Sequence, residues 1–260
     1  MENDEAYANA DFIPDGAAYP DRWRAASDAF RKDHGDSLGI AYGDEPRQTY
    51  DLFMPDGAPE GVLIFVHGGY WMKFGPEVFS HLAAGPLARG WAVAMPSYPL
   101  APEARIADIT LSIARAVDAI AERLAGSIIL AGHSAGGHLV SRMGNDDVEL
   151  EARDRIRRIV PISPLSDLAP LMATSMNADL RIDAVEALLE SPARRQAPAC
   201  PVSIWVGEAE RPAFLHQARM LSRLWCADLV IDPERHHFDI IEALTDPETP
   251  LTRTVTTIPE

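Results

Sequence analysis

The feature that most constrains this chain is a serine placed between a buried strand and a helix. Residues 132–136 read Gly-His-Ser-Ala-Gly, follow the apolar run 127–131 and precede a helical pattern that starts at Gly137. This order predicts a tight strand–turn–helix with Ser134 at its apex, where the glycines let strand and helix approach without a Cβ clash. A hydroxyl held clear of its neighbours, beside backbone N–H groups, can act as a nucleophile. Ser134 is therefore the candidate nucleophile.

A second motif lies upstream of the first. The apolar run 62–66 reads as a buried parallel strand and leads directly into residues 67–71, His-Gly-Gly-Tyr-Trp. Two successive glycines free the backbone to point N–H groups into a cleft, as the negative oxygen of an acyl-transfer transition state requires. The N–H groups of Gly68 or Gly69 and of Ala135 are therefore the candidate oxyanion hole. Each motif alone also fits a plain turn, but both in this order favour an acyl-transfer site.

Composition and charge narrow the class of protein and of partner. The chain has 260 residues and a formal net charge of −16, which argues against nucleic acids and anionic membranes as partners. Its two cysteines, Cys200 and Cys226, match no metal motif and predict no disulfide framework. The acidic start is not typical of a signal peptide, and no apolar run approaches about 18 residues. We expect a cytoplasmic protein with a small-molecule acyl substrate and no cofactor or metal. Homodimer formation stays open.

Short apolar runs alternate with helical patterns along the chain, which implies a mostly parallel sheet with helices on both faces. We predict a single α/β domain over residues 1–260. Residues 1–35 form an N-terminal arm with a helix, and residues 163–199 form a cap-like insertion over the site. The predicted strands are 50–54, 62–66, 91–95, 127–131, 158–162, 202–206 and 228–231. The predicted helices are 21–32, 76–89, 103–125, 135–144, 213–225 and 238–245.

A serine nucleophile needs a base, and the base needs an orienting acid. In strand–serine–helix folds the acid and then the histidine follow the serine along the chain, at the carboxyl ends of later strands. His236 and His237 follow the last predicted strand, and we favour His237 because it adjoins the apolar start of the next helix. His216 falls inside a predicted helix and reads as structural or solvated.

The acid should follow the strand predicted at 202–206. Glu208 and Glu210 are the candidates, and Glu210 has the better reach because it lies further into the loop. The plain alternative is a solvated glutamate paired with Arg211. His67 is expected to bond the backbone of the oxyanion loop, and His138 to be packed in the interior.

These motifs resemble the α/β-hydrolase enzymes and, within them, the animal-type kynurenine formamidases (arylformamidases). The resemblance covers most of residues 40–245. Through it, Ser134 and His237 are implied to be nucleophile and base. The family has an aspartate at the position of Glu210, whose side chain is longer by about 1.5 Å. The pieces that carry the resemblance are 42–43, 67–71, 132–136, 166–171, 173–175 and 237–242, while 98–103 is shared more broadly with hormone-sensitive-lipase-like carboxylesterases.

The resemblance implies an α/β-hydrolase fold and a serine hydrolase that cleaves a small acyl group from an aryl amide or ester. N-formylkynurenine is the substrate it implies, giving formate and kynurenine. Tyr70 and Trp71 are candidate substrate contacts, or anchors of their loop. A general short-chain carboxylesterase would use the same Ser134, Glu210 and His237. A non-catalytic binding protein on the hydrolase fold is a further alternative, because glutamate replaces the family's aspartate.

Overall fold

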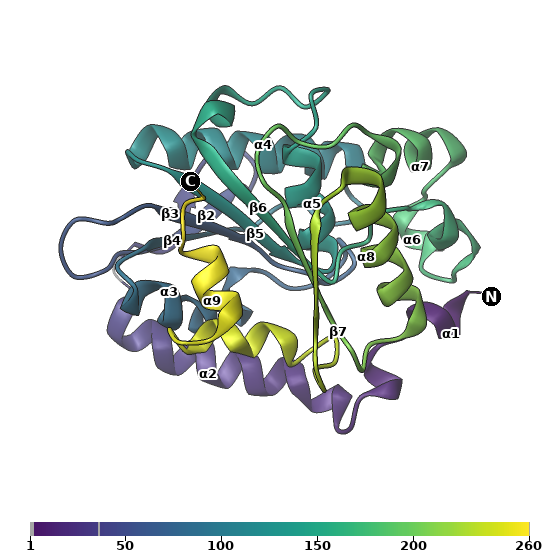
Figure 1. Ribbon diagram of the computed structural model, residues 1–260, viewed down its shortest axis with the longest axis horizontal. Helices are drawn as coiled ribbons and strands as arrows, with labels where there is room; N and C mark the ends of the chain where they lie inside the picture. Colours follow the sequence, from purple (N-terminus) through teal and green to yellow (C-terminus); the bar gives the residue numbers. More distant parts are fainter. Residues whose placement is uncertain (1–2, 36, 260) are drawn as a thin grey trace.

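A computed structural model describes residues 3–35 and 37–259, and a single sheet forms its centre. The strands are β1 (Ile40–Ala41), β2 (Thr49–Phe53), β3 (Val62–Val66), β4 (Ala92–Pro96), β5 (Ile128–His133), β6 (Ile156–Ile162), β7 (Ser203–Gly207) and β8 (Asp228–Asp232). They are ordered β1-β2-β4-β3-β5-β6-β7-β8 (Figure 1). The pairs β1–β2 and β2–β4 are antiparallel and all later pairs are parallel. The predicted mostly parallel sheet is confirmed.

Helices flank this sheet on both faces. Those of the α type are α1 (Asp4–Tyr7), α2 (Tyr19–His34), α3 (Ala84–Ala88), α4 (Ile106–Arg123), α5 (Ala135–Met143), α6 (Asn177–Leu180), α7 (Ala184–Glu190), α8 (Pro212–Trp225) and α9 (Pro250–Val255). Short 3₁₀ turns are η1 (Ala10–Phe12), η2 (Gly16–Ala18), η3 (Pro76–Val78), η4 (Ser80–Ala83), η5 (Glu151–Arg155), η6 (Ala169–Ala173), η7 (Pro192–Arg194) and η8 (Ile240–Thr245). Across 3–35 and 37–259, none of the helices combines the length and the hydropathy needed to cross a bilayer.

The central strands β3 and β4 are apolar and buried at every position because both of their faces are covered. In β3, Val62, Ile64 and Val66 pack into the core beneath α4, α5 and α8. The alternate residues Leu63 and Phe65 pack into a second core with α2, η4 and α9. The two layers lie on opposite sides of the sheet in Figure 1. Each fully buried side chain of this size contributes about 1.5–3 kcal/mol of transfer free energy, so the centre of the sheet is a stable base for the loops at its edge.

The sequence prediction was wrong in two helical regions. Residues 76–89 form η3, η4 and the short α3 instead of one helix, because Pro86 lacks an N–H and Gly85 is in close contact with another segment. A Cβ on Gly85 would lie 2.4 Å from the carbonyl oxygen of Leu244. Residues 240–245 form the 3₁₀ turn η8 in place of an α-helix. The short β1 and α9 were not predicted.

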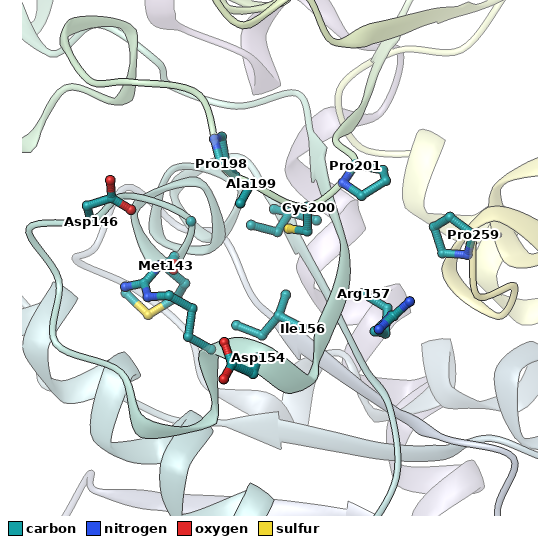
Figure 2. Close-up of a pocket in the computed structure, with 13 residues that line it drawn as sticks. Met143, Asp146, Asp154, Ile156, Arg157, Pro198, Ala199, Cys200, Pro201 and Pro259 are labelled. Carbon is teal, nitrogen blue, oxygen red and sulfur yellow. Dashed lines mark hydrogen bonds between the residues drawn. The ribbon is translucent and has the colours of Figure 1, made fainter.

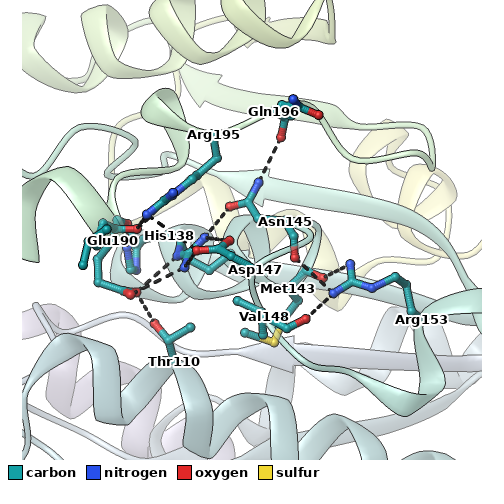
Figure 3. A network of polar contacts seen from close by, with 12 residues as sticks. Thr110, His138, Met143, Asn145, Asp147, Val148, Arg153, Glu190, Arg195 and Gln196 are labelled. Carbon is teal, nitrogen blue, oxygen red and sulfur yellow. Dashed lines mark hydrogen bonds and ion pairs between the residues drawn. The ribbon is translucent and has the colours of Figure 1, made fainter.

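A buried polar network joins the insertion 163–199 to the helix that follows Ser134 (Figure 3). Arg142 of α5 contacts Glu190 of α7 at 3.2 Å and Asp147 at 2.9 Å. Thr110 of α4 donates to the same Glu190 carboxylate at 2.7 Å. Because both Arg142 and Glu190 are buried, these partners compensate charges that are shielded from water. The network therefore fixes α7 against α4 and α5.

Candidate active site

Ser134 lies at the junction of β5 and α5 in a strained backbone conformation. Its φ of 57° and ψ of −115° are uncommon for a residue with a Cβ and cost on the order of 1–3 kcal/mol. A Cβ on Gly132 would lie 2.3 Å from the Gly136 carbonyl oxygen, and one on Gly136 would lie 2.0 Å from that of Val66. Both positions therefore require glycine. The predicted strand–turn–helix with the serine at its apex is present.

The structure brings His237 and Glu210 together as a buried pair. The His237 Nδ1 lies 2.7 Å from Glu210 Oε2, and both side chains are almost fully buried. Since a carboxylate only accepts, Nδ1 carries the proton and Nε2 is left as the basic nitrogen. Phe214 of α8 packs against the imidazole with ring centroids 4.3 Å apart. The pair therefore has the arrangement of a base and its orienting acid.

The second oxygen of Glu210 is also bound, which fixes the carboxylate in the loop after β7. Glu210 Oε1 accepts from the Gly207 N–H at 2.8 Å and from the Ser163 hydroxyl at 2.5 Å. Ser163 follows β6 directly and has a positive φ of 50°. It was not predicted from the sequence, although a serine directly after a buried parallel strand lies at the functional edge of such a sheet.

Gly207 brings this loop against the segment that carries the base. A Cβ on Gly207 would lie 2.2 Å from the carbonyl oxygen of Arg235, so only glycine allows this approach. The Ala209 N–H donates to the same carbonyl oxygen at 2.9 Å. These contacts fix the loop after β7 to Arg235, which precedes His237 by two residues.

The alternatives considered from the sequence are placed elsewhere. Glu208 is exposed, and its carboxylate accepts a long contact of 3.4 Å from the Glu234 N–H. His236 contacts the Tyr19 hydroxyl through Nε2 at 3.1 Å, and its Nδ1 accepts backbone N–H groups of its own turn. His216 is exposed on α8. Of the candidates, only Glu210 and His237 make the buried contact.

His133, the residue before the serine, was not assigned a role from the sequence. Its Nε2 lies 2.8 Å from the backbone carbonyl oxygen of His237, and the two imidazoles are 4.6 Å apart. Burial, followed by the nearby His237, holds the pKa of His133 well below its ordinary value. A neutral His133 therefore donates to the backbone of His237 and ties the nucleophile turn to the base.

The predicted oxyanion loop lies directly beside Ser134. A Cβ on Gly68 would lie 3.0 Å from the Ser134 Cβ, and Gly69 has a φ of +113° that favours glycine. The Gly69 carbonyl oxygen accepts the N–H of Lys73 at 3.1 Å, which closes the turn. As the first residue of α5, Ala135 has an N–H without an intrahelical acceptor. Backbone donors from the loop and from the helix are thus available at the serine.

His67 supports this loop, as the sequence predicted. Its Nδ1 donates to the Gly68 carbonyl oxygen at 2.7 Å, and its ring stacks on Tyr98 at 4.4 Å. The Tyr98 hydroxyl donates to the His67 carbonyl oxygen at 2.9 Å. Burial lowers the pKa of His67 to about 4, so the ring is neutral at pH 7. His67 is structural and does not titrate near neutral pH.

Tyr70 and Trp71 differ in location. Tyr70 lines the cavity that contains Ser134, and its hydroxyl donates to the Tyr7 carbonyl oxygen at 2.6 Å. Trp71 is fully buried and meets the His138 ring edge-on at 5.1 Å. The predicted substrate contact of Trp71 is therefore wrong: the indole packs in the core and anchors the loop. His138 is packed as predicted, with Nε2 at 2.7 Å from the Glu190 carbonyl oxygen.

Ser134 and His237 face a common cavity of about 390 Å³. No hydrogen bond joins the two side chains in the part of the chain that the structure describes, and such contacts are often loose until substrate binds. The wall is largely apolar and includes several aromatic side chains. Residues 7–23 of the N-terminal arm supply much of the lining. Their contribution to the site was not predicted from the sequence. Lining residues include Asn9, Asp11, Trp23, Gly68, Gly69, Tyr70, Lys73, Phe74, Phe79, Met176 and Phe238.

A second cavity, of about 350 Å³, lies near the carboxyl end of α5 (Figure 2). Its cysteine, Cys200, is half-buried, and burial raises the pKa of the thiol, which disfavours the reactive thiolate. Arg153 on its wall donates to the backbone carbonyl oxygens of Met143 and Asn145 and is thereby used structurally. Among the described residues that line this cavity there is no histidine to act as a base, unlike the first cavity.

Comparison with known proteins agrees with this geometry. The profile of the alpha/beta hydrolase family matches residues 63–256. The chain belongs to the α/β-hydrolase family. A protein from Silicibacter sp. TM1040 that carries a provisional thioesterase name is 53% identical, with a TM-score of 0.97 over 99% of this chain and 100% of that one.

Two further proteins resemble the chain, one in sequence and one in fold. The kynurenine formamidase of Danio rerio is 26% identical over 83% of this chain and 79% of its own length. Esterase B of Lactobacillus rhamnosis shares the fold at a TM-score of 0.66, with 16% identity over 92% of this chain and 90% of that one. The resemblance to kynurenine formamidases is confirmed, and the protein is a hydrolase of the ester or amide type.

Proposed function

We propose that this α/β hydrolase removes a small acyl group from an aryl amine, with N-formylkynurenine as substrate and formate and kynurenine as products. The observation that carries the proposal is the buried contact of 2.7 Å between Glu210 and His237, because His237 lines the same cavity as Ser134. The likeness to the Danio rerio kynurenine formamidase supports the choice of substrate.

In the first step, Ser134 is the nucleophile and His237 the general base. Glu210 holds the proton on Nδ1, so Nε2 is free to take the hydroxyl proton as Ser134 Oγ attacks the formyl carbon. The carbonyl oxygen becomes negative and is bound by backbone N–H groups of Gly69 and Ala135. Removing one donor of this kind costs about 2.7–4 kcal/mol of barrier, so their placement is a large part of catalysis.

In the second step, His237 returns the proton to the leaving nitrogen. The C–N bond breaks, the aryl amine departs and the formyl group stays on Ser134 as an ester. Water, deprotonated by His237, then attacks this ester; the bond to Ser134 Oγ breaks as His237 returns the proton to Oγ, and formate leaves. Glu210 stabilises the imidazolium in both halves, because its carboxylate stays buried beside the ring.

The cavity fits an aromatic leaving group. Phe74, Phe79 and Phe238 line it, and their rings offer offset-stacked or edge-on contacts to an aryl ring. A volume of about 390 Å³ is at the lower end of small-molecule sites, which suits a one-ring substrate.

The experiment is a substrate panel with purified protein: N-formylkynurenine, p-nitrophenyl acetate and acetyl-CoA. We expect the highest kcat/KM for N-formylkynurenine and loss of turnover in Ser134→Ala and His237→Gln, with both variants folded by circular dichroism. Turnover of the ester or the thioester without cleavage of the formamide would overturn the proposal.

A thioesterase or general short-chain carboxylesterase is the second candidate. The Silicibacter relative, at 53% identity, carries the provisional thioesterase name, and the same serine, histidine and glutamate would serve either reaction. Preference for acetyl-CoA in the panel selects the thioesterase, and preference for the nitrophenyl ester selects the carboxylesterase.

A further inference from the structure

The cavity beside Ser134 combines an aromatic wall with two opposite charges. Apart from its histidines, the charged side chains lining it within residues 3–35 and 37–259 are Asp11 and Lys73. Both are solvent-exposed, and they come from different elements. Asp11 belongs to η1 in the N-terminal arm, and Lys73 belongs to the turn that follows the oxyanion glycines. The wall thus offers one anion and one cation to the same occupant.

Among the described residues, Asp11 and Lys73 have no charged partner. In the described stretches, neither the Asp11 carboxylate nor the Lys73 ammonium forms an ion pair. Neighbouring charges of the arm are paired: Asp15 contacts Arg22 at 3.4 Å, and Glu5 contacts Arg211 at 3.6 Å. Asp11 and Lys73 therefore remain available to groups of a ligand.

Hydrogen bonds fix the two segments that carry Asp11 and Lys73 against the oxyanion loop. The Lys73 N–H donates to the Gly69 carbonyl oxygen at 3.1 Å, so Lys73 is fixed on the oxyanion turn. The arm is fixed to the same loop, because the Tyr70 hydroxyl donates to the Tyr7 carbonyl oxygen at 2.6 Å. A ligand that contacts both charges is thereby oriented with respect to Ser134.

We propose that Lys73 binds the carboxylate and Asp11 the ammonium of an α-amino-acid group on the substrate. The site would then select N-acyl aryl amines that carry a free amino-acid group over neutral aryl amides and over polyphosphate-bearing thioesters. A zwitterion satisfies both charges, whereas a polyanion meets one lysine and also an aspartate on the cavity wall, in a protein of net charge −16. This inference rests on the proposed function of Ser134, and it names the chemical class that the site recognises.

Direct binding tests the inference without relying on turnover. The probes are kynurenine, its decarboxylated analogue kynuramine and 2-aminoacetophenone, which lacks the whole amino-acid group. Their Kd values are measured by isothermal titration calorimetry with wild-type protein, Lys73→Met and Asp11→Asn. The matched controls are Lys32→Met, which replaces the other lysine of the chain, and Asp28→Asn, both at exposed positions of α2.

We expect Lys73→Met to raise the Kd of kynurenine about five- to tenfold, which is the size expected for the loss of a partly exposed ion pair. The Kd of kynuramine, which has no carboxylate, should not change. Asp11→Asn should weaken kynurenine and kynuramine by a similar factor and leave 2-aminoacetophenone unchanged. The Lys32 and Asp28 variants should match wild type. Equal Kd values for the three probes, no binding of kynurenine, or equal effects of the control variants would overturn the inference. Failure of the proposed function is seen separately, as no cleavage of N-formylkynurenine by the wild type.

Discussion

Replacing Glu210 by glutamine separates the charge of this side chain from its shape. Glu210 Oε1 already accepts two donors, the Gly207 N–H and the Ser163 hydroxyl. In Glu210→Gln the amide oxygen must take that place, because an NH₂ group cannot accept either donor. The amide NH₂ then faces His237 Nδ1, which carries the proton in the native pair, and two donors oppose each other. His237 can relieve this only by moving its proton to Nε2, where it no longer acts as a base.

The expected cost follows from this change of tautomer. A triad histidine held in the wrong tautomer loses about 10⁴-fold in kcat, which corresponds to about 5.5 kcal/mol of barrier. The assay is kcat for the best substrate of the panel, with thermal unfolding as the control for folding. If Glu210→Gln keeps more than a tenth of the wild-type kcat, Glu210 does not orient His237.

Glu210→Asp is the matched variant, because it keeps the charge and shortens the side chain by about 1.5 Å. If the loop stays in place, the contact to His237, now 2.7 Å, lengthens to about 4 Å. We expect a loss of about ten- to a hundredfold in kcat, smaller than for the amide because the carboxylate still favours the imidazolium. A loss as large as that of the amide would mean that position, and not charge, dominates.

Three further predictions concern the loop and the core. Tyr70→Phe, which frees the oxyanion loop from the N-terminal arm, should lower kcat three- to tenfold with little change in KM; an unchanged kcat argues against a positioning role. Burial lowers the pKa values of His67 and His138 to about 4 in the folded protein, compared with 6.5 in the unfolded chain. Between pH 6.5 and pH 4 the unfolded chain therefore binds more protons, and a fall in pH over this range destabilises the folded protein. Urea titrations from pH 7 to 5 should show the free energy of unfolding fall by about 2 kcal/mol per histidine, and less steeply in His138→Gln. Glu190→Gln removes one of the carboxylates that pair with buried Arg142. It should lower the free energy of unfolding by about 3 kcal/mol in the same urea titration, and a decrease below about 1 kcal/mol would contradict this.

The hydrophobic pattern was enough to predict the centre of the molecule. The run 62–66 matches β3, because a strand buried on both faces must be apolar throughout. The helix between 106 and 123 was also predicted, since its apolar stripe recurs at the helical period. Residues 76–89 were mispredicted, because close contact of Gly85 with Leu244 depends on a segment far along the chain.

For the site, chain order and local motifs placed the serine turn, the oxyanion glycines and the loops of the acid and the base. The sequence already favoured Glu210 over Glu208 and His237 over His236. The contact between the favoured pair needed coordinates, because adjacent loop residues point in different directions. Glu208 faces solvent and Glu210 faces His237, a difference set by the bonds that hold Glu210 Oε1.

The sequence by itself determined that this chain folds around a parallel sheet and presents a serine at a glycine-flanked turn, because strand burial and turn sterics are local properties. Only the tertiary structure decided which residues surround that serine. Trp71 lies in the core and not in the cavity, while Asp11 of the arm and Ser163 after β6 reach the site from distant parts of the chain. Such contacts depend on how separate elements pack against one another. The hydrophobic pattern of a single segment does not predict which distant residues it will contact.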